Sequence, residues 1–281
     1  MSVLARLVLT VQRWLPARSL GRRESDEAYV QWEYDSGRAL FERFFGSGRL
    51  AGSRLLDAAC GPGGKTAYYA EAGAAWVIGA DLDRGYLERA RRFAESRGVA
   101  SRLRLVAADV ERLPICDGAL DAVTANDAME HFADPGAALG EFARVLRPGG
   151  RVFLSFPPYR SAHGAHLYDY VRLPWCQVLL PRSVLREVVE GAVREAERVR
   201  GGAGAEERAA AIAAEQWTFF ERALNGLTVG RFLALVRGEP RLRLARLRLE
   251  PPKFGWLRPL AALPVLREYL AALAVAELER V

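Results

Sequence analysis

A strand, a glycine-rich turn and a helix are predicted at residues 54–72, and this segment constrains the fold more than any other. Two apolar residues, Leu55 and Leu56, lead to an acid, Asp57, and a turn with three glycines follows at residues 61–64. In such a unit the backbone N–H groups at the start of the helix face an anionic or polar ligand. The segment therefore predicts a nucleotide-type ligand at the end of the first strand.

A regular alternation of strands and helices is predicted from residue 53 to residue 157. Alternation at this spacing implies an α/β fold, in which a doubly wound parallel sheet has right-handed crossovers and helices on both faces. The predicted strands are 54–59, 75–81, 102–108, 120–126 and 151–156, and the predicted helices between them are 65–72, 84–97 and 137–146.

The alternation is absent from the two flanking parts of the chain. Residues 1–50 are predicted to form an N-terminal helical cover, and residues 158–239 a helical cap with helices at 167–180, 182–200, 206–224 and 229–237. An insertion of this length between two sheet strands usually covers a site. Residues 51–157 form the predicted core, residues 257–270 a further helix, and residues 240–281 return to the core.

The composition indicates a globular protein that does not bind nucleic acid. The net charge is +6, but all of the 40 basic residues except Lys65 and Lys253 are arginines, which is typical of a GC-rich coding bias. Three widely spaced cysteines argue against a disulfide framework and for the cytoplasm. They also lack metal-ligand spacing, so no metal site is predicted. The oligomeric state stays open.

The N-terminal segment has the pattern of an amphipathic helix. Apolar residues recur at a helical spacing, and Arg6 and Arg13 interrupt the run too early for a signal peptide or a membrane span. Packing on the rest of the protein and contact with a membrane surface are the two interpretations that this pattern allows. The apolar positions are Leu4, Leu7, Val8, Val11 and Leu15.

The glycine turn alone fits two different ligands. Residues 59–66 end in Gly64-Lys65-Thr66, like the phosphate loop of a nucleoside triphosphatase, but Ala59 replaces its first glycine. That enzyme also needs an acid that binds magnesium, and the acids near the fourth strand fit poorly. Thr66 stands where a nicotinamide enzyme would have its third glycine. S-adenosylmethionine fits better, because Asp81 and Asp109 end the second and third strands, where they can bind a ribose and an adenine.

The core resembles the class I S-adenosylmethionine-dependent methyltransferases, in the group that acts on quinones, sterols and natural products. The resemblance implies a seven-stranded sheet whose antiparallel edge comes from residues 241–250 and 271–281. The resemblance says little about the acceptor. If the aromatic residues after the fifth strand line a pocket, they favour an apolar acceptor such as an isoprenoid, quinone or polyketide, so the predicted function is methylation of a small or lipid-like molecule on oxygen or carbon. The matching segments are LLDAACGPGG (55–64), VIGADLDRGYL (77–87), AADVERLPICDGALDAV (107–123) and EHFADPGAALGEFARVLRPGG (130–150).

The same resemblance implies which residues bind the donor. Asp57 orders the loop, Gly61 and Gly63 let the backbone approach the donor, and Asp81 binds the ribose. Ala59 departs from the usual glycine and is expected to tighten the loop. Lys65 either approaches the donor's carboxylate or points to solvent. Further candidates are Leu82 beside Asp81, Asp109 and Val110 at the adenine, Asn126 along the donor site, and Tyr34 and Arg38 in the N-terminal segment.

Two clusters are candidates for assisting the transfer. Glu130 and His131 resemble part of a metal-binding stretch of ubiquinone-type O-methyltransferases, or else they cap a short helix. His163 and His166 follow the fifth strand, where an acceptor should lie, and an imidazole can take a proton near neutral pH. Alternatively, these two histidines fix a lid loop. A protein that binds the donor without catalysis is a further alternative.

Overall fold

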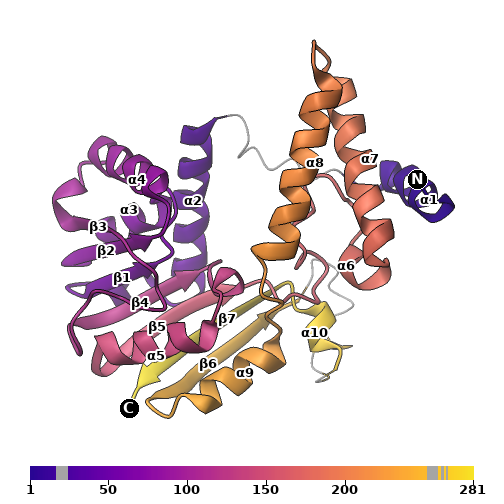
Figure 1. Cartoon of the computed structure of the whole chain (residues 1–281). Helices are drawn as coiled ribbons and strands as arrows, with labels where there is room; N and C mark the ends of the chain where they lie inside the picture. The colour runs from indigo at the N-terminus through magenta and orange to yellow at the C-terminus, as the bar shows by residue number, and fades with distance from the viewer. Residues whose placement is uncertain (17–24, 252–258, 261–262, 264) are drawn as a thin grey trace. The chain divides into compact units, whose positions relative to one another are not determined.

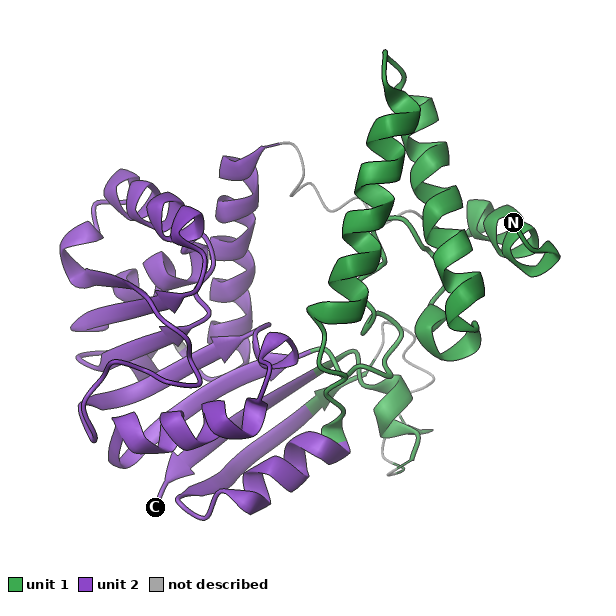
Figure 2. Cartoon of the chain, in the orientation of Figure 1, with its two compact units in different colours: residues 1–20, 157–229, 249–273 green, residues 21–156, 230–248, 274–281 purple. Residues whose placement is uncertain are grey.

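The structure is a computed structural model that describes the 281-residue chain except residues 17–24, 252–258, 261–262 and 264. The chain forms two compact units (Figure 2). Unit 1 takes in residues 1–20, 157–229 and 249–273, and unit 2 takes in residues 21–156, 230–248 and 274–281.

Unit 2 is built on a seven-stranded sheet with the order β3-β2-β1-β4-β5-β7-β6 (Figure 1). The β1–β2, β1–β4, β2–β3 and β4–β5 pairs are parallel, and β7 pairs antiparallel with β5. This arrangement confirms the predicted fold class. The strands are β1 (Arg54–Ala58), β2 (Trp76–Asp81), β3 (Leu103–Ala107), β4 (Leu120–Asn126), β5 (Leu146–Phe156), β6 (Leu242–Glu250) and β7 (Leu273–Arg280).

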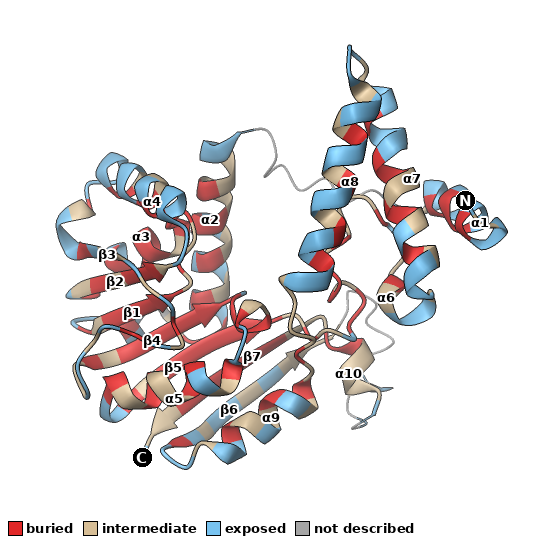
Figure 3. Cartoon of the chain, viewed as in Figure 1, coloured by how far each residue is buried: buried red, intermediate tan, exposed pale blue. Residues whose placement is uncertain are grey.

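Helices cover both faces of this sheet. One layer holds α2, α3 and α4, and the opposite face carries α5 and α9 (Figure 1). The central strands are buried on both faces (Figure 3), and this explains their near-continuous apolar sequences. The helices are α2 (Asp26–Phe44), α3 (Gly64–Glu71), α4 (Arg84–Ser96), α5 (Pro135–Val145) and α9 (Val229–Gly238), and three short 3₁₀ turns also belong to unit 2, η3 (Ser47–Leu50), η4 (Ala100–Arg102) and η5 (Met129–His131).

Unit 1 has its own helical core. The hairpin of α7 (Arg182–Arg200) and α8 (Ala205–Arg222) packs with α1 (Val3–Val11), which the turn η1 (Gln12–Trp14) follows. α1 approaches α7 closely, because a Cβ atom on Gly191 would lie 2.5 Å from Leu9. Aliphatic and aromatic side chains fill the space between the helices, among them Val188, Val193 and Trp217. The hydrophobic effect of burying them stabilises the unit.

The predicted helix at residues 167–180 is wrong over most of its length. Only α6 (Cys176–Leu179) is helical, and the preceding residues form turns. Pro174 cannot continue a helix, and Trp175 has a φ of 57°, which ends any helix that precedes it. The predicted helix at 257–270 lies partly outside the described residues, and its end forms α10 (Arg267–Leu270).

The two units divide the chain differently from the predicted segments. The expected N-terminal cover is split, because α1 belongs to unit 1 and α2 to unit 2. Residues 230–239, which the predicted cap includes, belong to unit 2, since Phe232 of α9 is fully buried and its ring lies 5.2 Å from that of Phe156. Among the described helices, none has the length and apolar character that a membrane span requires.

Candidate functional site

The glycine turn connects β1 to α3 in unit 2 with three residues in the left-handed region. Ala59 and Gly61 have φ values of 54°, and Gly63 has a φ of 83°. The N–H group of Cys60 donates to the carbonyl of Ala80 over 3.0 Å, and this bond ties the turn to β2. The turn therefore lies at the carboxyl ends of two adjacent parallel strands, where ligands of such folds bind.

Ala59 is a non-glycine residue in a conformation that favours glycine. We expect Ala59→Gly to raise the free energy of unfolding by about 1 kcal/mol, since a left-handed alanine costs roughly 1–2 kcal/mol and glycine loses part of that gain to chain entropy. Urea denaturation followed by circular dichroism measures the change. Ala58→Gly, one residue earlier in β1, is the control and should destabilise the protein. Equal losses in the two variants would contradict the assigned strain.

The buried carboxylate of Asp57 connects the glycine turn to the sheet through hydrogen bonds. It accepts hydrogen bonds from the hydroxyl of Thr66 over 2.6 Å and from the hydroxyl of Thr124 over 3.1 Å. Burial raises the pKa of Asp57 to about 6, while Thr66 and the Lys65 ammonium oppose that rise. Because Asp57 bonds to α3 and β4 together, it fixes the start of the helix relative to the sheet. The loop-ordering role that the resemblance implies for Asp57 stays a prediction.

Lys65 points into the protein and not into solvent. Its Nζ atom donates to the carbonyl of Asn126 over 2.9 Å and pairs with the Asp127 carboxylate at 3.3 Å. Burial lowers the pKa of Lys65, but the carboxylates of Asp127 and Glu33 outweigh it and raise the pKa above its usual value. In a phosphate loop the lysine and the following hydroxyl would face a polyphosphate and its magnesium ion. The hydroxyl of Thr66 instead donates to Asp57, so this geometry disfavours that alternative.

The three glycines of the turn differ in the space that a side chain would have beside them. A Cβ atom on Gly63 would lie 2.4 Å from Cβ of Ala90, and one on Gly64 would lie 2.3 Å from the carbonyl oxygen of Val30. A Cβ atom on Gly61 would have a single neighbour within 4 Å among the described residues, Oε1 of Glu33 at 3.8 Å. Gly63 and Gly64 thus allow α4 and α2 to pack on the turn, whereas Gly61 leaves room beside the backbone.

Acids and apolar residues gather at the ends of β2 and β3. Asp81 accepts hydrogen bonds from the N–H groups of Gly61 and Asp83, both over 2.9 Å. The N–H group of Ala108 donates to the Asp81 carbonyl over 3.0 Å, so the two strand ends stay together. Beyond them, the side chains of Leu82 and Asp109 are exposed, and Val110 is buried. The structure thus brings these predicted donor-binding residues to one edge of the sheet.

The end of β4 carries a second polar group. The side chain of Asn126 is buried, and its Nδ2 atom donates to the hydroxyl of Tyr69 over 2.5 Å. Its Oδ1 atom has no hydrogen-bond partner among the described residues. A buried acceptor in this state is costly unless a ligand supplies the donor.

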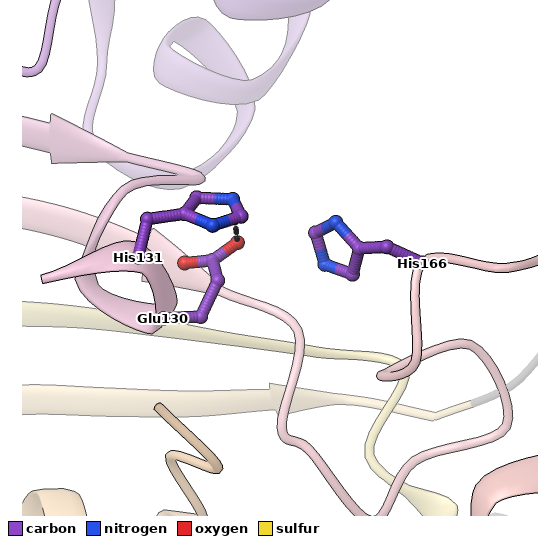
Figure 4. Close-up of side chains that lie close together, drawn as sticks. All are labelled: Glu130, His131 and His166. Carbon is purple, nitrogen blue, oxygen red and sulfur yellow. Dashed lines mark ion pairs between the residues drawn. The ribbon is translucent and has the colours of Figure 1, made fainter. Parts of the chain in front are cut away.

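Glu130 and His131 lie just beyond this strand end, on η5. Oε1 of Glu130 is 3.8 Å from Nε2 of His131, and Figure 4 draws this ion pair. Burial, together with the Asp127 carboxylate, raises the pKa of Glu130 well above its usual value. The raised pKa favours the protonated form of this carboxyl group, and a group of this kind can act as an acid or a base.

The candidates on α2 are placed differently from Glu33 of the same helix. The hydroxyl of Tyr34 donates to Glu71 over 2.6 Å, and Arg38 pairs with Glu42 at 3.0 Å. Glu33 instead faces the glycine turn, and sequence reasoning missed it. A detectable signal was Gly37, one helical turn after Glu33, where a Cβ atom would lie 2.7 Å from Cγ of Lys65. Such a glycine inside a helix indicates a close approach on that face.

His163 and His166 belong to unit 1, where they contact aromatic side chains. Their ring centroids lie 6.0 Å and 6.1 Å from that of Tyr168, and His166 is 6.1 Å from Phe219. Both histidines are half-buried, and His166 has a φ of 54°. A catalytic role for them stays a prediction.

A hollow of about 280 Å³ opens in unit 2 near the amino ends of β1 and β4, away from the glycine turn. Arg49 and Arg151 line it and both pair with Glu277, while Arg147 pairs with Asp121. Its arginines therefore already have acidic partners, and the hollow has no feature of a binding site for an anion.

Comparison with known proteins identifies the core of unit 2. Residues 56–154, about a third of the chain, match the family described as "Methyltransferase domain". This segment is similar to methyltransferase domains. Its match contains the glycine turn, the acids that follow β2 and β3, and the Glu130–His131 pair, so the resemblance to class I methyltransferases is confirmed for it.

Curated relatives share a limited part of the chain. A demethylmenaquinone methyltransferase from Thermus thermophilus is 48% identical over 110 residues, which are 38% of this chain and 49% of that protein. Methyltransferase GfsG from Streptomyces halstedii is 39% identical over 116 residues, which are 41% of each chain. The chain thus spans less than half the length of either relative.

Solved structures share the fold over more of the chain. An S-adenosylmethionine-dependent methyltransferase from Mesorhizobium loti has a TM-score of 0.53 and 17% identity, over 89% of this chain and 98% of that one. The [4+2]-cyclase SpnF has a TM-score of 0.55 and 17% identity, over 99% and 92% of the two chains. At this identity the similarity concerns the fold, which proteins with different activities share.

Proposed function

We propose that the chain is an S-adenosylmethionine-dependent methyltransferase. The observation that carries the proposal is the position of Asp81 within the segment that matches the methyltransferase family. Asp81 is the last residue of β2, and its carboxylate accepts a hydrogen bond from the N–H group of Gly61. Gly61 is the one glycine of the turn with open space beside it. An acid at this place is suited to accept hydrogen bonds from the two hydroxyls of a ribose.

The residues of unit 2 fit the parts of this donor. Asp81 would bind the ribose, and Leu82, Asp109 and Val110 would surround the adenine. The amino acid part would lie along Gly61, where the turn leaves room, and Asn126 would use its unpartnered Oδ1 atom toward the donor. The sulfonium of the donor supplies an activated methyl group, so the protein can accelerate the transfer largely by orienting the acceptor.

A proton acceptor is needed only if the acceptor molecule must lose a proton. Glu130 and His131 are candidates in unit 2, because a carboxyl group and an imidazole, which can both take up a proton, lie 3.8 Å apart just beyond β4. His163 and His166 are candidates in unit 1. We do not propose a metal ion at any of these four residues. Each can be replaced in turn, and a changed pH profile of turnover would identify the side chain that takes the proton.

The acceptor that we propose is a small apolar or lipid-like molecule, of the quinone or isoprenoid type. The support is the similarity of the donor-binding core to demethylmenaquinone methyltransferases, one of which is 48% identical over 110 residues. Incubation with S-adenosylmethionine that carries a labelled methyl group, and with demethylmenaquinone as the first acceptor, tests this. Labelled product that is lost in Asp81→Ala supports the proposal. Donor binding without transfer to any quinone or isoprenoid would indicate a different acceptor or a non-catalytic protein.

A membrane contact through α1 forms part of the same proposal. The outer face of α1 exposes Val3 and Leu7, and η1 directly after it exposes Trp14; these residues are 83%, 58% and 88% accessible. The inner face of α1, with Ala5, Val8 and Leu9, packs in the core of unit 1. The exposed Arg6 sits among the outward residues, and its charge complements anionic lipids. An apolar acceptor dissolved in a bilayer would then lie near the bound protein.

Vesicle sedimentation with phosphatidylglycerol checks this contact. We expect the double variant Leu7→Asp with Trp14→Asp to bind at least about tenfold more weakly than the wild type, since each buried side chain contributes roughly 1.5–3 kcal/mol. Val199→Asp is the control, because Val199 of α7 is 84% exposed and receives the same type of change. Equal binding of all three proteins would overturn the assignment of α1.

A further inference from the structure

Glu33 carries a buried carboxyl group in unit 2. Its side chain is 7% exposed, and its Oε2 atom has no hydrogen-bond partner among the described residues. The Glu33 carboxyl group accepts a backbone hydrogen bond from Gly64, but leaving its second oxygen buried and unpartnered is costly, because buried polar atoms in folded proteins are almost always satisfied. A ligand that donates hydrogen bonds would remove this cost.

The carboxyl group lies against the glycine turn. A Cβ atom on Gly64 would be 2.7 Å from Cβ of Glu33, which shows how closely α2 approaches the start of α3. Oε1 of Glu33 is the neighbour that a Cβ atom on Gly61 would meet, at 3.8 Å. Glu33 therefore borders the open side of Gly61, next to the space that we assigned to the amino acid part of the donor.

The charges around Glu33 favour a cation. Among the charged groups that act on the Glu33 carboxyl group, Lys65 is positive, whereas Asp57 and Asp127 are negative. The Lys65 ammonium already donates to the carbonyl of Asn126 and pairs with Asp127. Glu33, Asp57 and Asp127 thus have a single positive group among them, Lys65, and these bonds of Lys65 do not go to Glu33. A second cation beside Glu33 would therefore be stabilised by the surplus of negative charge.

We propose that Oε2 of Glu33 binds the ammonium group of the donor's amino acid part. The proposal rests on the proposed function, because it concerns the same ligand. A primary ammonium group carries three N–H donors, and one of them would satisfy the buried oxygen through a charge-assisted hydrogen bond. Glu33 would then be a binding residue that discriminates between donors with and without the amino group.

Calorimetric titration with two nucleosides tests this assignment. S-adenosylhomocysteine carries the ammonium group, and 5′-methylthioadenosine lacks the whole amino acid part. We expect Glu33→Gln to bind S-adenosylhomocysteine about tenfold more weakly than the wild type does, since a charged hydrogen bond becomes a neutral one. Its affinity for 5′-methylthioadenosine should stay within about twofold. Asp35→Asn, which removes an exposed carboxylate from the same helix, should change neither affinity.

A second readout separates binding from a structural role. Burial raises the pKa of Glu33 to about 7, while Lys65 opposes the rise. Since this folded-state pKa lies above the value of 4.5 for an unperturbed carboxyl group, Glu33 destabilises the protein increasingly as the pH rises through 7. The melting temperature of Glu33→Gln without ligand should therefore exceed that of the wild type at pH 8 and approach it at pH 5.

The experiments on Glu33→Gln can give three results. Selective loss of S-adenosylhomocysteine affinity, with a higher melting temperature at pH 8, supports the ammonium site. Equal loss for both nucleosides, or a lower melting temperature at pH 8, would overturn it, because Glu33 would then stabilise the fold itself. If the wild-type protein binds neither nucleoside, the proposed function fails first, and that outcome differs from a failure of the Glu33 assignment alone.

Discussion

Asp81→Ala is expected to weaken the binding of S-adenosylhomocysteine about 100-fold, because two charge-assisted hydrogen bonds to the ribose together contribute roughly 3 kcal/mol. The substitution also removes the acceptor for the N–H group of Gly61, which lies 2.9 Å from the Asp81 carboxylate. The first loss acts on the bound state alone, and titration calorimetry measures it. The second acts on the free protein as well, and thermal melting without ligand measures it. Turnover should fall in parallel at low donor concentration.

Asp81→Asn is the matched control for that experiment. Its amide oxygen can still accept from Gly61, so the turn should keep its conformation, and the neutral group should lower affinity by only about tenfold. Circular dichroism and thermal melting verify that both variants are folded. An unchanged affinity in Asp81→Ala would remove the observation on which the proposed donor site depends.

Gly63→Ala is expected to lower the free energy of unfolding by about 3 kcal/mol or more, from left-handed strain together with overpacking. Gly63 has a φ of 83°, and its Cβ atom would lie 2.4 Å from Cβ and 2.8 Å from Cα of Ala90. The second of these is a backbone atom, so α4 would have to move. Urea denaturation measures the loss, and donor affinity should fall with it, because the turn moves too.

Gly98→Ala separates the cost of the left-handed backbone conformation from the cost of overpacking. Gly98 has a similar φ of 72°, but a Cβ atom on it would meet no atom of the described residues within 4 Å. Its substitution should therefore cost only the conformational part, about 1–2 kcal/mol. The difference between the two variants measures the packing of α4 on the turn. Equal losses would mean that Gly63 is required only for its backbone conformation.

The core of unit 2 could be predicted because its strands and helices each leave a pattern within a short stretch of sequence. Strands buried on both faces of a parallel sheet give short apolar runs, and the predicted strand at 120–126 matches β4 in full. Asp57, Asp81 and Asp109 could be placed because each follows such a run, so chain order alone brings them to one edge of the sheet. The two strands of the antiparallel edge followed from the family resemblance.

Glu33 could not be found in this way, since its role depends on contacts between distant segments. On α2 it is one acid among several. Gly37 indicates a close approach on that face of the helix, but the contacts with Gly61 and Gly64 are what distinguish Glu33 from exposed neighbours such as Asp35. The same reason limits the prediction for unit 1. Its core joins α1 to α7 and α8 across more than 150 residues, and no local pattern encodes that pairing.

Calorimetric titration of the wild-type protein with S-adenosylhomocysteine, followed by a titration with ATP and magnesium, tests the central claim most directly. The structure leads us to expect saturable binding of S-adenosylhomocysteine at one site and no heat of binding from the nucleotide. Binding of ATP with magnesium, without binding of S-adenosylhomocysteine, would contradict the account, since the turn at residues 59–66 would then hold a polyphosphate.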